Sequence, residues 1–289
     1  MAITFDLFDK IINLRMYRED GSVVTIETPA TGRKPSIRIS GTLVTQDIMQ
    51  QIELRITNFV SDQPLDQYKY ITIEAGYRTG VTVGFRVQVL VAFQELPGPD
   101  GVTCFTCLLG DIDSWRTTTF SGKYTAGSLL KNVLQDVASQ MGMDLEYSAD
   151  ETLQLKIDIY QNGLAKDLFP KLIRNFTSYT ADGAYSGIRI APYGNKILCF
   201  NANKGTGVVH VLNFIAHAKH SAKGYDIQAP WVPPARPGDS LQIDPKYFRQ
   251  DFGGSQVAAG NLFQIYSVAF EFATDDDTNQ MTVLTVGAA

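Results

Sequence analysis

The sequence predicts a mainly β protein that carries an α+β insertion, and three observations support this fold class. Four runs of alternating apolar and polar residues follow one another between residues 51 and 110. Further alternating runs fill the last third of the chain, and helical spacing is confined to the stretch between. Because alternation at period two indicates strands with one buried face, the chain divides into β, α+β and β segments.

The four runs in the first third are rich in Ile, Val, Thr and aromatic residues, and Gly, Pro and Asp clusters separate them. They occupy residues 52–59, 70–77, 85–93 and 102–109. This composition is typical of antiparallel strands. Four such strands in succession predict a meander, and a meander of this length predicts a sandwich or a barrel.

Shorter alternating runs at 11–17, 23–27 and 36–43 precede the meander. Asp20-Gly21 lies between the first two runs and predicts a hairpin, because glycine adopts a positive φ without steric cost. Residues 1–115 are therefore predicted to form a first β domain.

The middle of the chain, residues 116–206, is predicted to be an α+β insertion domain. Apolar residues at 129, 130, 133, 134, 137, 138 and 141 follow helical spacing, and Gly142 is a suitable stop. A second helix is predicted over 164–176, where Pro170 is expected to kink or shorten its start. Strands are predicted at 153–160, 187–191 and 196–200.

Strand patterns resume in residues 207–289, the predicted second β domain. They begin at 208–212 and continue to 229, and a strand at 240–243 follows the turn Pro237-Gly238-Asp239. Two long runs, 262–272 and 281–286, flank an acidic turn at 275–279.

Composition excludes several classes of function. With 25 basic against 30 acidic residues the net charge is −5, so the chain lacks the basic footprint of a nucleic-acid-binding protein. The N-terminal residues do not form a signal peptide, and no apolar run is long enough for a membrane helix, so no membrane insertion is expected. Three cysteines do not complete a disulfide framework, and we expect them to be small buried hydrophobic residues.

No motif predicts a catalytic, metal or cofactor site. His217-x-x-His220, with His210 upstream, has no carboxylate or cysteine at ligand spacing. Cys104-x-x-Cys107 has redox spacing but lies within a predicted strand, away from any helix N-terminus. The acidic turn at 275–279 lacks the glycine and the closing glutamate of a calcium loop. We therefore expect a protein that is not an enzyme and binds no cofactor.

The order of several short motifs resembles the baseplate hub proteins of phage tails and related contractile injection machines. The motifs are residues 53–58, the run ending in Ala75-Gly76-Tyr77, Gly110-Asp111, the stretch 233–243 and the run 263–268. The resemblance covers most of the chain in layout. This chain is at the compact end of the family, without a long extra C-terminal module or a lysozyme-like motif.

The resemblance implies two tail-tube-like β-barrel or sandwich domains divided by the α+β insertion. It implies a homotrimeric ring that joins the six-fold tail tube to the three-fold spike and leaves a channel for DNA, which passes without being bound. The partners implied are further copies of the chain, the tail tube protein, the tail spike or other baseplate proteins, and a tape measure protein. The implied location is the tail baseplate of the virion, after synthesis in the bacterial cytoplasm.

Two sets of residues are candidates for roles in such an assembly. Structural turns are predicted at Gly76, Gly110, Asp111, Pro237, Gly238 and Asp239. A strand between subunits is predicted from Phe85, Val87, Val89, Val91 and Phe93, because long alternating strands expose backbone edges. Arg38, Arg55 and Arg86 lie on polar strand positions and are expected to pair with carboxylates such as Glu53 and Glu74.

Two other functions stay open on the sequence alone. One is a carbohydrate- or receptor-binding β-sandwich protein of a tail tip, for which Trp115, Trp231 and the tyrosines would supply stacking platforms. The other is an enzyme of unrecognised type, such as a peptidoglycan hydrolase, although the sequence offers no pair of carboxylates in motif context.

Overall fold

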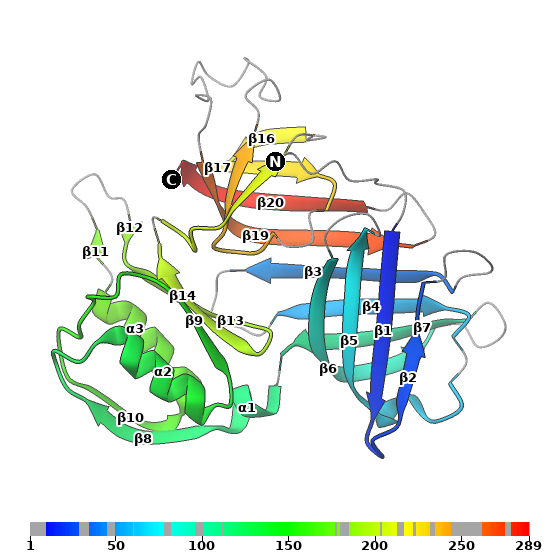
Figure 1. The fold of residues 1–289 in the computed structure, drawn as a ribbon, viewed down its shortest axis with the longest axis horizontal. Coiled ribbons are helices and arrows are strands. Elements are labelled where there is room, and N and C mark those ends of the chain that lie inside the picture. The colour runs from blue at the N-terminus through cyan, green and yellow to red at the C-terminus, as the bar shows by residue number, and fades with distance from the viewer. Residues whose placement is uncertain are drawn as a thin grey trace.

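The computed structural model describes most of the chain (Figure 1). The described residues are 10–28, 35–44, 50–59, 61–77, 82–95, 101–110, 112–176, 178–179, 185–202, 204–212, 217–221, 224–231, 235–243, 262–274 and 279–288. Asp111 and the acidic turn at 275–278, both singled out above, lie outside these residues.

The first third of the chain forms strands close to the runs that the sequence predicts. They are β1 (Lys10–Arg18), β2 (Val23–Ile26), β3 (Ile37–Val44), β4 (Gln51–Thr57), β5 (Tyr68–Tyr77), β6 (Thr82–Gln94) and β7 (Val102–Leu109), with the 3₁₀ helix η1 (Leu65–Gln67) before β5. Alternate residues are buried, as in β4, where Ile52, Leu54 and Ile56 are completely buried between exposed neighbours. The period-two pattern therefore marks the buried face, as expected.

The predicted four-strand meander is wrong at its first strand. Strands β5, β6 and β7 do pair in succession, but β4 pairs with β7, which gives the order β3-β4-β7-β6-β5-β1-β2. In Figure 1 β1 and β5 cross steeply over β3, β4 and β7, so β4 and β5 belong to two layers. Both layers bury their apolar residues in one cluster, so a direct β4–β5 pair would remove one wall of the core.

The last third of the chain extends the same sheet. Its strands are β15 (Val209–Leu212), β16 (His217–Ser221), β17 (Gly224–Ala229), β18 (Ser240–Ile243), β19 (Leu262–Ala273) and β20 (Asn279–Ala288). Strand β19 pairs antiparallel with β3, from Ser267 opposite Val44 to Ala273 opposite Arg38. The sheet thus runs without a break from β16 to β2, across the predicted boundary between the two β domains.

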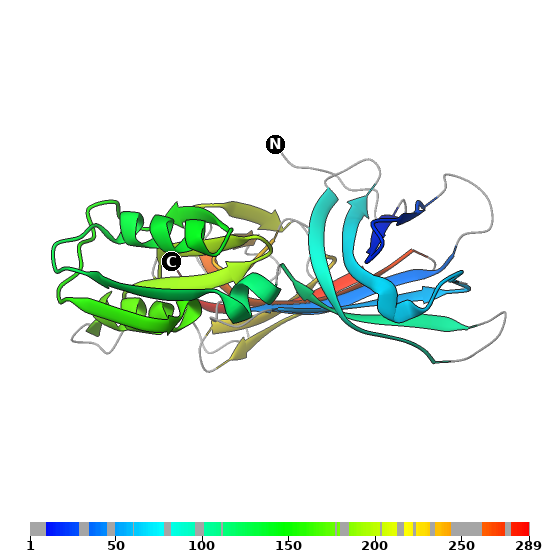
Figure 2. The ribbon, with the colours of Figure 1, turned by 90° about the horizontal axis from the view of Figure 1, so that it is seen from below.

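The middle of the chain folds as an α+β module beside this sheet (Figures 1 and 2). Its elements are α1 (Ile112–Thr117), β8 (Thr119–Tyr124), α2 (Leu130–Gln140), β9 (Asp144–Ser148), β10 (Ile159–Leu164), η2 (Ala165–Asp167), α3 (Leu168–Phe176), β11 (Ser178–Tyr179), β12 (Tyr185–Ser186), β13 (Ile188–Tyr193) and β14 (Lys196–Asn201). Strand β9 joins β14 in parallel, and β8 pairs with β10 in a separate ribbon.

The module differs from the sequence prediction in its strands. The predicted strand at 153–160 begins only at Ile159, and β8 and β9 were not predicted. Residues 150–158 instead hold a turn at 151–152, an isolated β-bridge from Gln154 to Leu129 and a bend at 156–157, and the Asp150 carboxylate accepts a hydrogen bond from the Thr152 amide. Pro170 lies in the first turn of α3, where a missing N–H costs no helical hydrogen bond, and the turn before it is the 3₁₀ helix η2.

Two hydrophobic clusters hold the chain together. The first combines residues from the first and last thirds, and at its centre the ring of Phe270 stacks on Phe85 and on Trp231 with centroids 6.0 and 4.9 Å apart. The second draws its buried members only from Trp115 to Cys199, within the module. The module therefore has a core of its own, whereas the two outer thirds share one; the predicted domain boundaries at 115 and 206 stay a prediction.

Candidate functional site

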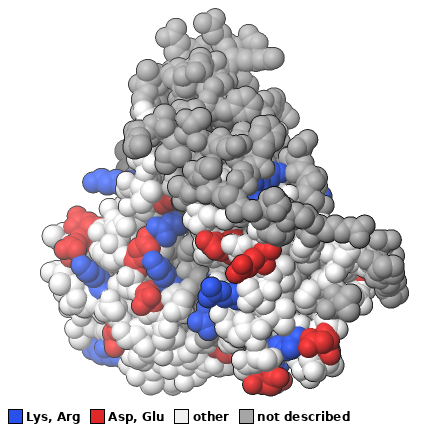
Figure 3. Space-filling view, turned by 45° about the vertical axis from the view of Figure 1, so that its right-hand side comes forward, with Lys and Arg blue, Asp and Glu red and all other residues white. Residues whose placement is uncertain are grey.

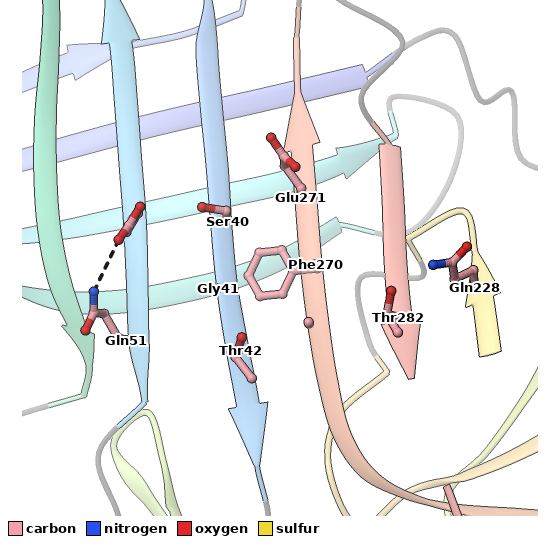
Figure 4. Close-up of a pocket in the computed structure, with 10 residues that line it drawn as sticks. Ser40, Gly41, Thr42, Gln51, Gln228, Phe270, Glu271 and Thr282 are labelled. Carbon is pink, nitrogen blue, oxygen red and sulfur yellow. Dashed lines mark hydrogen bonds between the residues drawn. The ribbon is translucent and has the colours of Figure 1, made fainter. Parts of the chain in front are cut away.

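The polar face of the shared sheet is the first candidate surface. Ser40 and Thr42 on β3 lie between Glu53 on β4 and Glu271 on β19, and this face bears a hollow of about 600 Å³ (Figure 4). The hollow forms because small side chains occupy its floor, including Ala269 and the two hydroxyl residues of β3. Its walls and floor offer hydroxyl, amide and carboxylate groups.

The arginines of this face are paired with carboxylates. Arg38 donates a hydrogen bond to Glu271 at 3.1 Å, and Arg55 forms an ion pair with Glu95. The hydrogen bond from Arg55 holds the pKa of Glu95 below its usual value. Each guanidinium is thus neutralised by a carboxylate of its own sheet, so the face presents little free positive charge.

The pairing partners differ from those expected. Glu53 accepts a hydrogen bond from Gln51 at 3.4 Å, and Glu74 accepts hydrogen bonds from Asn13 and Thr82. Glu53 shares β4 with Arg55 and neighbours β3, and Glu74 on β5 neighbours Arg86 on β6, yet the hydrogen bonds of both carboxylates come from uncharged side chains.

Arg86 also departs from the expectation. Its guanidinium lies over the ring of Tyr70, 5.2 Å from the centroid, on the neighbouring strand β5. Acidic and basic side chains alternate over the face shown in Figure 3, without a basic patch among its described residues.

The predicted intersubunit strand, β6, changes face along its length. Phe85 and Val87 are buried in the chain's own core, and Val89 packs against it. A β-bulge between Val89 and Val91 then reverses the alternation. Beyond it Val91 and Phe93 lie opposite Thr106 and Cys104 and are 54% and 45% exposed.

The predicted structural turns lie at two kinds of place. Gly76 is inside β5, opposite Ile11 and Thr82, near the end of that strand. Gly110 and Gly238 instead lie where the sheet meets the module. Pro237 and Gly238 are the two central residues of one turn, which the Asp239 amide closes on the carbonyl of Arg236.

Close backbone contacts form the joint between module and sheet. Gly110 has a φ of 100°, and a Cβ there would collide with the carbonyl of Gly194 in the β13–β14 turn. Gly238 has a φ of 93°, and a Cβ there would lie 2.7 Å from the ring of Phe200 on β14. Glycine is needed at both positions for its backbone conformation and for the space it leaves.

Asp239 is the second candidate site, because its carboxylate is buried and contacted from three sides. The side chain is 1% exposed. Thr206 donates a hydrogen bond to Oδ1 at 2.5 Å, and Nε2 of His210 lies 2.8 Å from Oδ2. The Nε atom of Arg236 is 3.5 Å from Oδ1. These contacts satisfy the buried charge and fix the segment that leads from the module into β15.

Arg236 links this carboxylate to the module. Its guanidinium forms a bidentate ion pair with Glu146 on β9 and lies over the ring of Tyr193, 5.5 Å from the centroid. Burial tends to raise the pKa of Glu146, but the hydrogen bonds and charge of Arg236, with the charge of Lys196, outweigh it and hold that pKa below its usual value. Burial raises the pKa of Tyr193 to about 12, so its hydroxyl stays protonated at neutral pH.

Sequence reasoning identified Asp239 only as a turn residue and missed Glu146, Arg236, His210 and Thr206 as its surroundings. The available signal was the Arg236-x-x-Asp239 spacing beside a turn glycine. Glu146, Thr206 and His210 come from distant parts of the chain, and no local pattern brings them to Asp239.

The remaining candidates have ordinary structural roles. Cys104, Cys107 and Cys199 are buried and free, and burial raises the pKa of each thiol. His217 and His220 lie on strand β16, where three-residue spacing places them at opposite parities. Within the described residues no three His, Cys, Asp or Glu side chains gather as metal ligands, and no helix is long and apolar enough to cross a membrane.

The fold is similar to that of phage tail proteins. Over 96% of this chain and 98% of the other, it matches the 43 kDa tail protein of prophage MuSo2 from Shewanella oneidensis, at 10% identity and a TM-score of 0.64. It matches a tail protein from Neisseria meningitidis at 8% identity, over 97% of each chain, with a TM-score of 0.60. The predicted resemblance to tail hub proteins is confirmed at the level of the fold.

A further similar structure comes from Escherichia coli. It is described as a component of the type VI secretion system with structural similarity to the T4 bacteriophage tail proteins gp27 and gp5. The match covers 89% of this chain and 76% of that chain, at 10% identity and a TM-score of 0.59. Comparison by sequence gives no match, either to models of protein families or to curated proteins.

Proposed function

We propose that this chain is a structural hub protein of a phage tail baseplate or a related injection machine. Three copies form a ring that joins the six-fold tail tube to the three-fold spike and leaves a channel for DNA. The observation that carries the proposal is the likeness of the whole chain, module included, to tail proteins of nearly the same length.

The topology of the sheet supports a ring of several copies. The path of paired strands runs from β16 to β2, and within the described residues the sheet does not close on itself. Open edges of this length invite pairing with another chain unless they are protected. A second copy can supply the missing neighbour at each end.

The polar face of the sheet is suited to line the proposed channel. A channel wall rich in free lysine and arginine would hold DNA through its phosphates and would release bound counterions. Here the arginines Arg38 and Arg55 are already paired with Glu271 and Glu95. DNA would then pass the ring without being retained.

The proposed partners follow from this placement in a tail. They are further copies of the chain, the tail tube protein on one side, and the tail spike or other baseplate proteins on the other. A tape measure protein inside the channel is a further partner. The proposed location is the tail of the virion, and the proposed role is structural and not catalytic.

The alternative of a carbohydrate-binding tail-tip protein has less support. Its stacking platforms were to include both tryptophans, but Trp115 is 4% exposed and Trp231 is 2% exposed. Buried indole rings pack in the two cores and offer no face to a sugar.

The mass of the purified protein in solution tests the proposal. We expect light scattering coupled to size exclusion to give three times the mass of one chain at micromolar concentration. Even a weak trimer would form at about millimolar protein concentration. A mass of one chain at every concentration up to that value would therefore contradict the ring.

A further inference from the structure

We propose that the solvent face of the layer formed by β2, β1, β5 and β6 holds a binding site for an acidic sugar, such as a uronic acid unit of a polysaccharide. This face bears a hollow of about 310 Å³, which shares no lining residue with the hollow between β4 and β19. We call it the β1 hollow, and Arg15 lies at its centre. The inference does not depend on the ring proposed above, and it makes no use of the two buried tryptophans.

The pairing of four strands arranges this face in rows that cross the layer. The register places Arg15 opposite Thr25 on β2 and opposite Thr72 on β5, and Thr72 in turn lies opposite Arg86 on β6. Neighbouring strands lie about 5 Å apart, so the two hydroxyl residues flank the arginine directly. A guanidinium between two hydroxyl groups is suited to a carboxylate, because each of the three can donate a hydrogen bond to a carboxylate oxygen.

Arg15 lacks the partners that other arginines of the large sheet have. Arg38 and Arg55 pair with carboxylates, and the guanidinium of Arg86 lies over the ring of Tyr70. Arg15 is exposed, and its side chain forms no hydrogen bond or ion pair with a residue that the structure describes. Its charge is therefore available to a ligand from outside the chain.

The next row along the strands supplies hydrogen-bond acceptors. It holds Asn13 and Glu74, which lie opposite each other about 7 Å from the row of Arg15, and Glu27 lines the hollow on the same side. Asn13 and Thr82 donate one hydrogen bond each to Glu74, at 3.2 and 3.3 Å. A carboxylate has about four acceptor positions, so Glu74 can accept further hydrogen bonds. These carboxylates suit the hydroxyl hydrogens of a sugar.

An aromatic ring and an open floor complete the site. Beyond Arg15 on the same strand, Tyr17 lines the hollow and is 36% exposed, so part of its ring can contact a sugar. Gly84 lies opposite Glu74, and a Cβ there would meet nothing within 4 Å. The hollow therefore owes part of its volume to the side chain that Gly84 lacks. Its size is at the lower end of the range for small-ligand pockets, about 300–1,000 Å³.

The same groups disfavour other classes of ligand. A peptide that adds a strand needs a free backbone edge, but β1 and β5 are each paired on both sides. A phosphate or a nucleic acid, with its higher charge, would meet Glu27 and Glu74 beside Arg15. A single carboxylate on a polyhydroxylated ring uses the cation, the acceptors and the aromatic ring together.

Titration of the purified protein with an oligosaccharide of galacturonic acid tests the site. We expect saturation-transfer NMR and calorimetry to show binding with a dissociation constant of about a millimolar or below. The methyl-esterified oligosaccharide keeps the hydroxyls but loses the charge, so it should bind at least about ten-fold more weakly. Inorganic phosphate at constant ionic strength should not displace the acid.

Two variants locate the binding. Arg15→Gln removes the cation and should weaken binding of the acid at least about ten-fold. Gly84→Leu fills the hollow but keeps every polar group, and it should also weaken binding at least about ten-fold. The control is Arg116→Gln, at an exposed arginine of α1 in the module, which should bind as the wild type does. Circular dichroism should show all three variants folded.

The outcomes decide this inference separately from the proposed function, which the mass in solution tests. Binding that prefers the acid to the ester, falls in both Arg15→Gln and Gly84→Leu and persists in Arg116→Gln supports the site. Absence of binding to the folded wild-type protein at about 10 mM oligosaccharide overturns it. Equal binding of acid and ester, displacement by phosphate, or binding that is unchanged in either site variant overturns it as well.

Discussion

Gly238 illustrates how a single residue holds the module against the sheet. Its φ of 93° is one that side-chain-bearing residues adopt at a cost, and the Phe200 ring occupies the place of a Cβ. Gly207 has a similar φ of 82°, but a Cβ there would meet nothing within 4 Å. A substitution at Gly207 therefore adds backbone strain alone, whereas one at Gly238 adds both strain and a steric collision.

We expect Gly238→Ala to lower the free energy of unfolding by about 3 kcal/mol or more, as strain and overpacking add. Gly207→Ala should cost about 1 kcal/mol, from strain alone. Urea denaturation of the two variants measures the difference. Equal losses would show that Phe200 moves aside without cost and that Gly238 is only a turn residue.

The sequence identified turn glycines and strand parity but not the partners of buried charges. Pro237-Gly238-Asp239 was recognised because turn chemistry is local. The environment of the Asp239 carboxylate depends on Thr206 and His210, about thirty positions away, and on the docking of the module beside them. Contacts of this kind are set by tertiary packing, which alternation patterns do not encode.

At the scale of elements, Arg236 links β9 of the module to the turn before β18. It neutralises Glu146 and Asp239 together, and its side chain is 16% exposed. Removal of its charge would leave two carboxylates close together in a partly buried place. Such uncompensated charges are among the costlier defects in a folded protein.

We expect Arg236→Gln to lower the free energy of unfolding by about 2–4 kcal/mol, because Asp239 loses its guanidinium partner and Glu146 keeps only Lys196, 3.4 Å away. The matched control is Lys131→Gln, which breaks the exposed pair with Glu151 and should cost less than about 0.5 kcal/mol. Chemical denaturation at neutral pH measures both. Similar small losses would mean that the joint does not depend on the Glu146–Arg236 pair.

The same pair predicts a dependence of stability on pH. The pKa of Glu146 lies below its usual value of 4.5 in the folded protein, so the unfolded chain takes up the proton first as the pH falls. The contribution of this carboxylate is therefore complete above pH 4.5 and is lost as the pH falls through the folded pKa. Glu146→Gln should be less stable than wild type at neutral pH, and the difference should shrink in acid.

Urea titrations at about pH 3 and about pH 7 test this dependence, with Glu151→Gln as the exposed control. A difference between wild type and Glu146→Gln that is the same at both pH values would contradict the assignment of the pKa shift to the Arg236 contact.

The sequence predicted which segments form strands and helices more reliably than it predicted which strands pair with one another. Strands with one buried face, such as β4 and β5, showed clear alternation, and α2 showed clear helical spacing. Strands β8 and β9 have partly buried residues on both faces or mixed patterns, and the sequence did not reveal them. The β4–β7 pair was missed because nearest-neighbour pairing is only the commoner arrangement, and the two-layer core favours another.

At the scale of the whole molecule, the paired arginines of the sheet face predict weak interaction with DNA. We expect no retention of a short DNA duplex by the purified protein in a mobility-shift assay at low salt. Glu95→Gln with Glu271→Gln removes the carboxylates that pair with Arg55 and Arg38 and should introduce weak, salt-sensitive retention. Salt-sensitive binding by the wild-type protein would contradict the account of the channel.

The central claim is that the open sheet of one chain becomes a closed ring of three. Electron microscopy of the purified protein tests it most directly. The account predicts top views with an open centre, three-fold symmetry and the α+β modules outside the wall, in which each chain contributes the β3–β19 seam. Compact particles without a central opening, of the size of a single chain, would contradict it.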